Sequence, residues 1–206
     1  ERAKIIVPAL EHEMLDGDIA YIKLYNFSKK ATEDFEAALE DLLAQEPAGL
    51  ILDLRNNPGG ERNSAVEITS QFIDEGVIMY QEYGDGSRDT FEAVKGGLAP
   101  DIPLVVLINE GSASGSEIVA GAIQDYERGI LVGKVSFGKG SVQNWIPLAN
   151  DQGLVRVTIA RWLTPNERTI HELGVVPDIE IEYMQEDFEN ELDPQLDKAI
   201  ELLINP

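Results

Sequence analysis

The chain has 206 residues, 43% of them hydrophobic, so we expect a single globular domain with one sizeable core. A formal net charge of −22 argues against nucleic acid as a ligand, because the phosphate backbone would be repelled. No apolar run approaches the roughly 20 residues that span a bilayer, and no signal peptide is visible. The absence of cysteine excludes disulfides and thiolate chemistry, and we expect neither a metal nor another cofactor.

Along the first two thirds of the chain, strand-like and helix-like segments alternate. Residues 16–27 predict a strand, and residues 32–47 predict an amphipathic helix with Thr32 as its N-cap. Two short apolar runs, 49–55 and 103–109, are typical of strands buried on both faces. The remaining expected elements are a helix carrying Ala65, Ile68 and Phe72, a hairpin around 83–87, a helix after the serines of 111–116, and a strand at 129–133.

The last third of the chain has a different pattern. Residues 141–148 and 154–164 alternate in polarity around the turn "ANDQG" and predict an antiparallel pair. Residues 193–203 predict a helix with Asp193 at its N-cap. We therefore expect an α/β fold with a largely parallel central sheet, followed by an antiparallel strand pair and a C-terminal helix.

The expected domain has three parts along the sequence. Residues 1–15 are predicted to be a linker remnant, and residues 16–183 the core. Residues 184–206 are predicted to be an acidic connector that leads into the C-terminal helix.

Two loops follow the two buried strands. The turn "NNPGG" comes directly after the first strand, and "GSASGSE" follows the second. Open α/β folds place their sites at the carboxyl ends of parallel strands. We therefore expect these two loops to meet and to build a site.

Ser114 has two possible roles in the second loop. With Glu117 three residues later, it forms the capping-box pattern of a helix start, and capping alone is one reading. The other reading makes its hydroxyl a nucleophile at the positive end of the helix, where the free amide of Gly115 would stabilise an oxyanion. The local sequence is compatible with both.

A nucleophilic serine needs a base, and the two histidines are poor candidates. His12 lies in an acidic stretch and His171 in a turn-like segment, so a lysine base is expected. Lys139 stands between two glycines, and in an extended segment it shares one face with Ser141 and Gln143, whose amide oxygen could orient the amine. A lysine acts as a base only when uncharged, which requires burial. A surface lysine in a glycine-rich turn is the alternative.

Together these segments resemble the C-terminal processing peptidases, also called tail-specific proteases. Those proteins are serine endopeptidases with a Ser-Lys dyad on a crotonase-like (ClpP/crotonase-type) α/β core. The resemblance covers nearly the whole chain and rests on several motifs in the family's order. These are "GDIAYIKLYNF", "GLILDLRNNPGG", "VLINEGSASGSEIVAGAIQD", "VGKVSFGKGSVQ", "TIARWLTPN", "GVVPDIE" and "DPQLDKAIELL".

The resemblance implies a role for each matching residue. Ser114 would be the nucleophile and Lys139 its general base, with Gln143 as the partner of the lysine. Ser112 and Ser116 would be supporting residues. The single hydroxyl of Ser114 would then both start the helix and attack the peptide.

The resemblance also implies an oxyanion hole and a setting. Its backbone amides would be those of Gly115 and of a glycine in "NPGG", with Gly60 preferred over Gly59. The implied substrates are proteins or peptides with flexible C-terminal tails, and the implied location is extracytoplasmic: periplasm, cell envelope or secreted. Family members usually carry a PDZ domain upstream of "GDIAYI", which this sequence does not include. Glu167 replaces the glycine that usually follows the asparagine of "TPN".

Two other functions remain open on the same fold. One is a catalytically silent peptide-binding module in which Lys139 is displaced from Ser114. The other is a crotonase-like acyl-transfer or hydratase enzyme, which needs paired oxyanion amides and no dyad.

Overall fold

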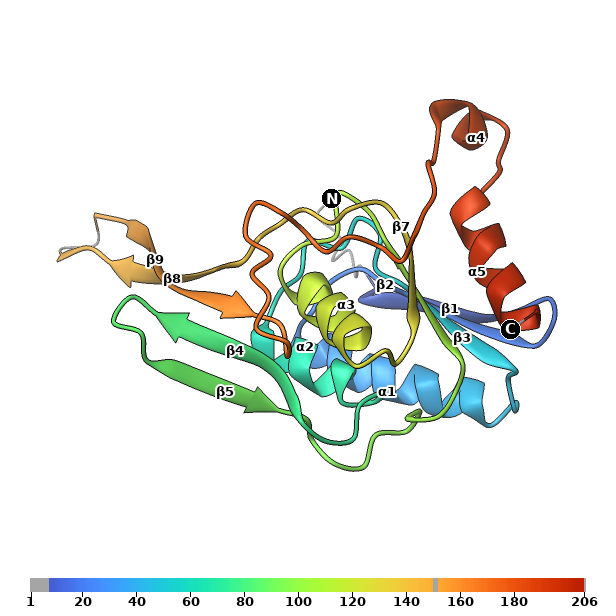
Figure 1. Cartoon of the computed structure of the whole chain (residues 1–206), viewed down its shortest axis with the longest axis horizontal. Coiled ribbons are helices and arrows are strands. Elements are labelled where there is room, and N and C mark those ends of the chain that lie inside the picture. Colours follow the sequence, from blue (N-terminus) through green and yellow to red (C-terminus); the bar gives the residue numbers. More distant parts are fainter. Residues whose placement is uncertain (1–7, 150–151, 206) are drawn as a thin grey trace, which may run out of the picture.

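The computed structural model describes residues 8–149 and 152–205. The strands of its larger sheet are β1 (Leu10–Leu15), β2 (Ile19–Leu24), β3 (Gly49–Asp53), β6 (Leu104–Ile108), β7 (Ile130–Gly133) and β10 (Ile179–Glu180). They lie in the order β1-β2-β3-β6-β7-β10, and every neighbouring pair is parallel except β1 and β2 (Figure 1). The predicted α/β fold with a largely parallel central sheet is confirmed.

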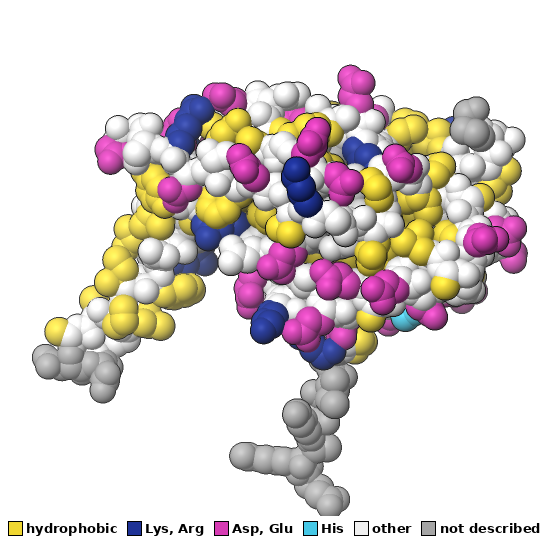
Figure 2. Space-filling model, turned by 90° about the horizontal axis from the view of Figure 1, so that it is seen from below, with side chains coloured by type: hydrophobic (Ala, Val, Ile, Leu, Met, Phe, Trp, Pro, Cys, Tyr) yellow, Lys and Arg dark blue, Asp and Glu magenta, His cyan; other side chains and the backbone are white. Residues whose placement is uncertain are grey.

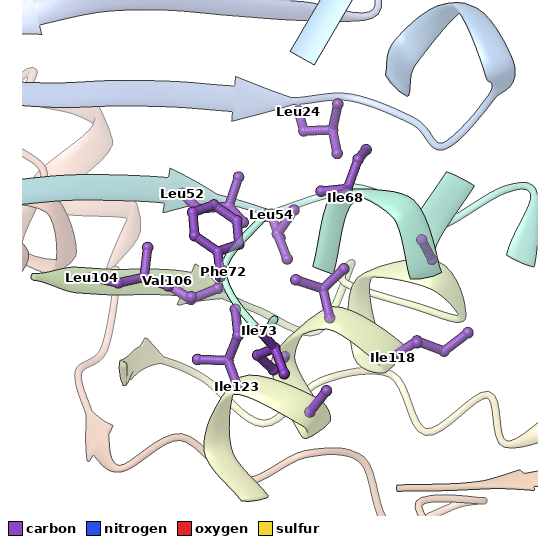
Figure 3. Close-up of a cluster of buried hydrophobic side chains, with 14 of the residues drawn as sticks. Leu24, Leu52, Leu54, Ile68, Phe72, Ile73, Leu104, Val106, Ile118 and Ile123 are labelled. Atoms are coloured by element: carbon purple, nitrogen blue, oxygen red, sulfur yellow. The ribbon is translucent and has the colours of Figure 1, made fainter. Parts of the chain in front are cut away.

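Helices cover both faces of this sheet. They are α1 (Lys29–Leu43), α2 (Arg62–Thr69), α3 (Gly115–Asp125) and, on the other face, α5 (Pro194–Ile204). Successive strand residues point to opposite faces. Leu50, Leu52 and Val106 therefore pack with α1, α2 and α3, whereas Ile51 and Val105 pack with α5. Figure 3 shows the first of these clusters. Because side chains pack on both faces of the sheet, both central strands are buried along their whole length.

A smaller antiparallel sheet extends from the body. Its strands are β4 (Val77–Tyr83), β5 (Arg88–Glu92), β8 (Ser141–Pro147) and β9 (Leu154–Leu163), in the order β5-β4-β9-β8. The predicted hairpin and the predicted strand pair are both present. The outer half of β8 and β9 projects as an arm whose surface is mostly hydrophobic (Figures 1 and 2). Residues 150 and 151, in its predicted turn, lie outside the described residues.

Three local predictions differ from the structure. Residues 10–15, assigned to a linker remnant, form β1 and pair with β2 along the sheet edge; residues 1–7 lie outside the described residues. Helix α1 begins earlier than expected, because Ser28 Oγ accepts from the Ala31 N–H (3.2 Å) and takes the cap position. Thr32, the expected cap, is buried and bonded to Ser64 (2.8 Å).

The C-terminal region matches its predicted cap. Asp193 accepts from the Leu196 N–H (3.0 Å) and starts α5, with Pro194 at the first helical position. The acidic connector contains one short helix, α4 (Gln185–Glu189), which the sequence did not indicate. Within residues 8–149 and 152–205, no helix is both long and apolar enough to cross a membrane.

Candidate active site

The loops after β3 and β6 meet, as the sequence predicts. The Ala113 N–H donates to Asn57 O (3.0 Å), and the Ser116 hydroxyl donates to the same carbonyl (2.9 Å). Gly59 packs so closely that a Cβ there would lie 2.7 Å from Gly115 N and 2.7 Å from Ser114 Cβ. Only a glycine fits this approach, which brings the "NNPGG" loop against the start of α3.

Ser114 occupies a strained position at the start of α3. Its φ of 54° and ψ of −109° lie in a region that residues with a side chain rarely adopt, and such strain concentrates at active sites. Ser112 and Ser116, by contrast, are fully buried, and their hydroxyls donate to Leu54 O (2.7 Å) and Asn57 O (2.9 Å). Ser114 is the serine of this loop whose side chain lines an open cleft.

Glu117 links the nucleophile candidate to the lysine loop. Its carboxylate is fully buried, and its Oε2 accepts from the Ser114 N–H (2.7 Å) and the Lys139 N–H (3.0 Å). Its Oε1 accepts from the Gly138 N–H (2.6 Å) and the Ser136 hydroxyl (2.6 Å). The sequence predicted Glu117 only as a helix cap. Half of that capping box forms, and Ser114 Oγ makes no hydrogen bond to the helix backbone.

Lys139 lines the same cleft as Ser114. Both residues, together with Gly60, line one cavity of about 340 Å³. Trp162 on β9 fixes the lysine loop, since its Nε1–H donates to Lys139 O (2.9 Å). Lys139 is half-buried rather than fully enclosed, and the exposed Trp145 of the arm forms part of the lining of the same cavity.

Gln143 shares the cavity with the lysine but does not bond to it. Lys139, Ser141 and Gln143 line the same cavity, as the extended segment predicted. The side-chain amide of Gln143 instead lies 3.5 Å from Thr158 Oγ1. A contact with the amine of Lys139 would require a different rotamer of Gln143.

The backbone amides of the first loop differ in their availability. The Gly59 N–H donates to Asn57 Oδ1 (2.9 Å) and is already used. The N–H groups of Gly60 and Gly115 donate to no acceptor among the described residues, and Gly60 lines the cavity. The predicted oxyanion amides of Gly60 and Gly115 are therefore without an acceptor among the described residues, whereas that of Gly59 is not.

Neither histidine shares the cavity with Ser114. His12 lies on β1, with its Nε2 3.8 Å from Asp41. His171 lines a neighbouring hollow behind Lys139, and its Nδ1 is buried with no partner among the described residues. Lys139 therefore shares the cavity with Ser114, and neither histidine does.

A buried ionic cluster lies at the start of the "NNPGG" loop. Arg55 follows β3 and donates to Asp53 (2.7 Å), to Asp193 (2.8 Å) and to Gln195 Oε1 (3.1 Å). Burial lowers the pKa of Arg55, but the hydrogen bonds to the two carboxylates outweigh it and raise the pKa overall. Burial raises the pKa of Asp193, and the bond from Arg55 outweighs it, so that pKa falls below its ordinary value. Sequence reasoning missed this cluster, whose only signal is the charged "DLR" that ends an otherwise apolar strand.

The fold and the cavity define a class of protein: an α/β domain in which a strained serine and a lysine face one cleft beside two free amides. The family model described as Peptidase family S41 matches residues 18–181. The chain therefore belongs to peptidase family S41.

Proteins similar to this chain include named proteases, in agreement with this family. The chain is 42% identical to a carboxy-terminal-processing protease of Bartonella bacilliformis over 86% of this chain and 42% of that protein. It is 43% identical to a carboxyl-terminal-processing protease of Synechocystis sp. over 80% of this chain and 38% of that protein. The solved structure of a photosystem II D1 C-terminal processing protease superposes with a TM-score of 0.79 at 30% identity, covering 98% of this chain and 54% of that one. The chain thus spans about two fifths of the length of the curated relatives it matches.

Proposed function

We propose that this chain is the peptidase domain of a serine endopeptidase that cleaves extended C-terminal segments of proteins. Ser114 is the nucleophile and Lys139 the general base. The observation that carries the proposal is the carboxylate of Glu117, which holds the backbone amides of both residues on one oxygen, at 2.7 and 3.0 Å, beside a shared cavity.

The reaction follows from these positions. Ser114 Oγ attacks the carbonyl carbon of the scissile peptide while Lys139 Nζ, in its uncharged form, accepts the hydroxyl proton. The carbonyl oxygen becomes an oxyanion, which accepts from the N–H groups of Gly60 and Gly115. The C–N bond then breaks, the amine leaves with the proton from Lys139, and an ester on Ser114 remains. Water, deprotonated by the same lysine, hydrolyses that ester.

Gln143 orients the amine of Lys139 in this proposal, after a rotamer change away from Thr158. Its absence should lower kcat more than it changes KM, because the interaction serves the proton transfer.

The substrate class and setting rest on the relatives. The names of the similar Bartonella and Synechocystis proteins support carboxy-terminal processing of protein substrates. An extracytoplasmic location and selection of substrate tails by a PDZ domain accompany this function in the family that the sequence resembles. Both belong to the proposal for the whole protein, of which this chain spans a part.

Single substitutions test the mechanism. Ser114→Ala and Lys139→Ala should each abolish cleavage of an unfolded protein and leave the circular dichroism spectrum unchanged, whereas Lys95→Ala, on an exposed loop, should keep full activity. Full activity of either cavity variant would reject the mechanism. A serine-reactive probe that leaves Ser114 unlabelled would favour the silent binding module. Thioester turnover without proteolysis would favour an acyl-transfer or hydratase enzyme.

A further inference from the structure

The charged side chains that line the catalytic cavity are all positive. They are Arg62, Lys139 and Arg156, and no carboxylate of the described residues lines the same cavity. The chain as a whole has 38 acidic residues and 16 lysines and arginines, so chance favours the opposite sign. In Figure 2, Asp and Glu are scattered over the body, and some of the fewer Lys and Arg side chains lie where the arm leaves it.

Arg62 is held in place by uncharged groups. It is the first residue of α2, and its Nη1 donates to Gln81 Oε1 (2.8 Å). Its guanidinium lies over the ring of Phe91, 4.1 Å from the centroid. Gln81 is itself buried and fixed by Tyr83 (2.6 Å). The guanidinium is thus oriented before any ligand arrives.

This orientation leaves Arg62 without an anionic partner. Its Nε is buried and has no hydrogen-bond partner among the described residues. Four other arginines have such partners: Arg55, Arg88 and Arg168 pair with carboxylates, and Arg128 donates to three backbone carbonyls. The Nη2 of Arg62 lies 3.5 Å from Asn63 Oδ1, at the limit of a hydrogen bond. A fixed guanidinium that has no carboxylate partner matches the planar geometry of a carboxylate, which it can bind through two parallel hydrogen bonds.

Arg156 adds a second cation to the cavity. It lies on β9 opposite Trp145, with its guanidinium 5.8 Å from the centre of the indole ring. No ion pair joins it to a carboxylate within residues 8–149 and 152–205. Unlike Arg62, Arg156 lies on the exposed arm. We therefore expect it to attract an anionic ligand electrostatically rather than to bind the ligand in one fixed geometry.

We propose that Arg62, assisted by Arg156, forms a carboxylate-binding subsite beside Ser114. The inference rests on the proposed peptidase function and adds its substrate class: peptide segments that carry a carboxylate close to the scissile bond. The net charge alone predicts the reverse preference, for basic peptides. Exposed charges more than about 10 Å away are largely screened, however, whereas a fixed guanidinium in the cavity acts at contact distance.

The carboxylate has two possible sources, and binding measurements distinguish them. The affinities of labelled peptides for the Ser114→Ala variant are measured in two series. In the first, one sequence carries either Glu or Gln at each position in turn. In the second, the peptide with a free C-terminal carboxylate is compared with its C-terminal amide. We expect at least one acidic peptide to bind on the order of tenfold more tightly than its neutral match. An effect of internal Glu identifies a side-chain carboxylate, and an effect of amidation identifies the chain terminus. Equal binding across every pair overturns the proposal.

Variants in the Ser114→Ala background assign the preference to its residue. Arg62→Gln should remove it and leave the affinity for the neutral peptide within about twofold, while Arg62→Lys should retain part of it, since charge remains without the planar fork. Arg161→Gln is the matched control, because Arg161 lies on β9, as Arg156 does, but outside this cavity. A preference that survives Arg62→Gln, in a variant with an unchanged melting temperature, would also overturn the proposal.

Cleavage by the native serine form separates this inference from the proposed function. Cleavage without any carboxylate preference refutes the subsite and leaves the peptidase function intact. Carboxylate-selective binding with no cleavage of any peptide refutes the peptidase function and leaves the subsite intact.

Discussion

Glu117→Gln is the most informative change to the dyad, because it keeps the shape of the side chain and alters only its hydrogen-bonding groups. The native carboxylate accepts four bonds from donors. The amide oxygen of the glutamine can still accept from the N–H groups of Ser114 and Lys139 if its nitrogen takes the position of Glu117 Oε1. That nitrogen then meets the Ser136 hydroxyl and the Gly138 N–H. The Ser136 oxygen already accepts from the Val175 N–H (2.7 Å) and can accept a second bond only if its proton turns away, whereas the Gly138 N–H cannot accept at all.

The expected cost follows from these contacts. One buried N–H loses its acceptor at about 1–3 kcal/mol, and two charge-assisted bonds become ordinary ones at roughly 1 kcal/mol each, partly offset by the lower cost of burying a neutral group. We expect a loss of about 2–4 kcal/mol in the free energy of unfolding, or about 5–15 °C in melting temperature for a chain of this size. Displacement of the two loops by about 1 Å would lower cleavage about a hundredfold.

Thermal unfolding and cleavage of an unfolded protein, both at neutral pH, measure the two effects. Glu110→Gln, an exposed position in the same loop, is the control and should change neither. Native-like melting and native-like cleavage by Glu117→Gln would refute the view that this carboxylate holds the dyad together.

Three further outcomes are expected. The bond from Arg55 lowers the pKa of Asp193 below its ordinary value, so its stabilisation is present above about pH 4 and declines as the pH falls below that value; Asp193→Asn should be less stable than the native chain in urea at pH 7, and the difference should shrink as the pH is lowered below about 4. Gly59→Ala places a Cβ 2.7 Å from Ser114 Cβ at a φ of 92°, so both cleavage and melting temperature should fall. Ser116→Ala removes a buried hydrogen bond and should cost about 1 kcal/mol in urea unfolding while cleavage persists.

The central strands could be predicted from the sequence because their signal is local. The segments 49–53 and 104–108 are apolar at nearly every position, and the structure buries every residue of both strands. Their adjacency then brings the two following loops together at one edge of the sheet. Strand β1 had no such signal, because the exposed face of this edge strand is polar and "LEHEML" lacks a clean alternation.

The site residues also divide into those with a local sequence signal and those without one. Ser114 and Lys139 could be singled out as candidates from short motifs, each read within a few neighbours, and the structure places both on one cavity. The contacts of Glu117 with Gly138 and Lys139 join segments more than 20 residues apart, and the stacking of Arg62 on Phe91 depends on the hairpin that follows α2. Such pairings depend on tertiary structure, so sequence spacing cannot reveal them.

The two readings of Ser114, helix cap and nucleophile, are reconciled by its backbone conformation. In an ordinary capping box the serine Oγ accepts from a helix N–H, which would hold the hydroxyl against the helix. At a φ of 54° the Ser114 N–H reaches Glu117, while its Oγ makes no such bond and lines the cavity. The backbone strain costs of order 1–3 kcal/mol, and the four hydrogen bonds to the buried carboxylate offset it. The same carboxylate therefore accepts from the residue that starts the helix and holds the strained turn, so the proposed chemical role of this loop depends on its structural role.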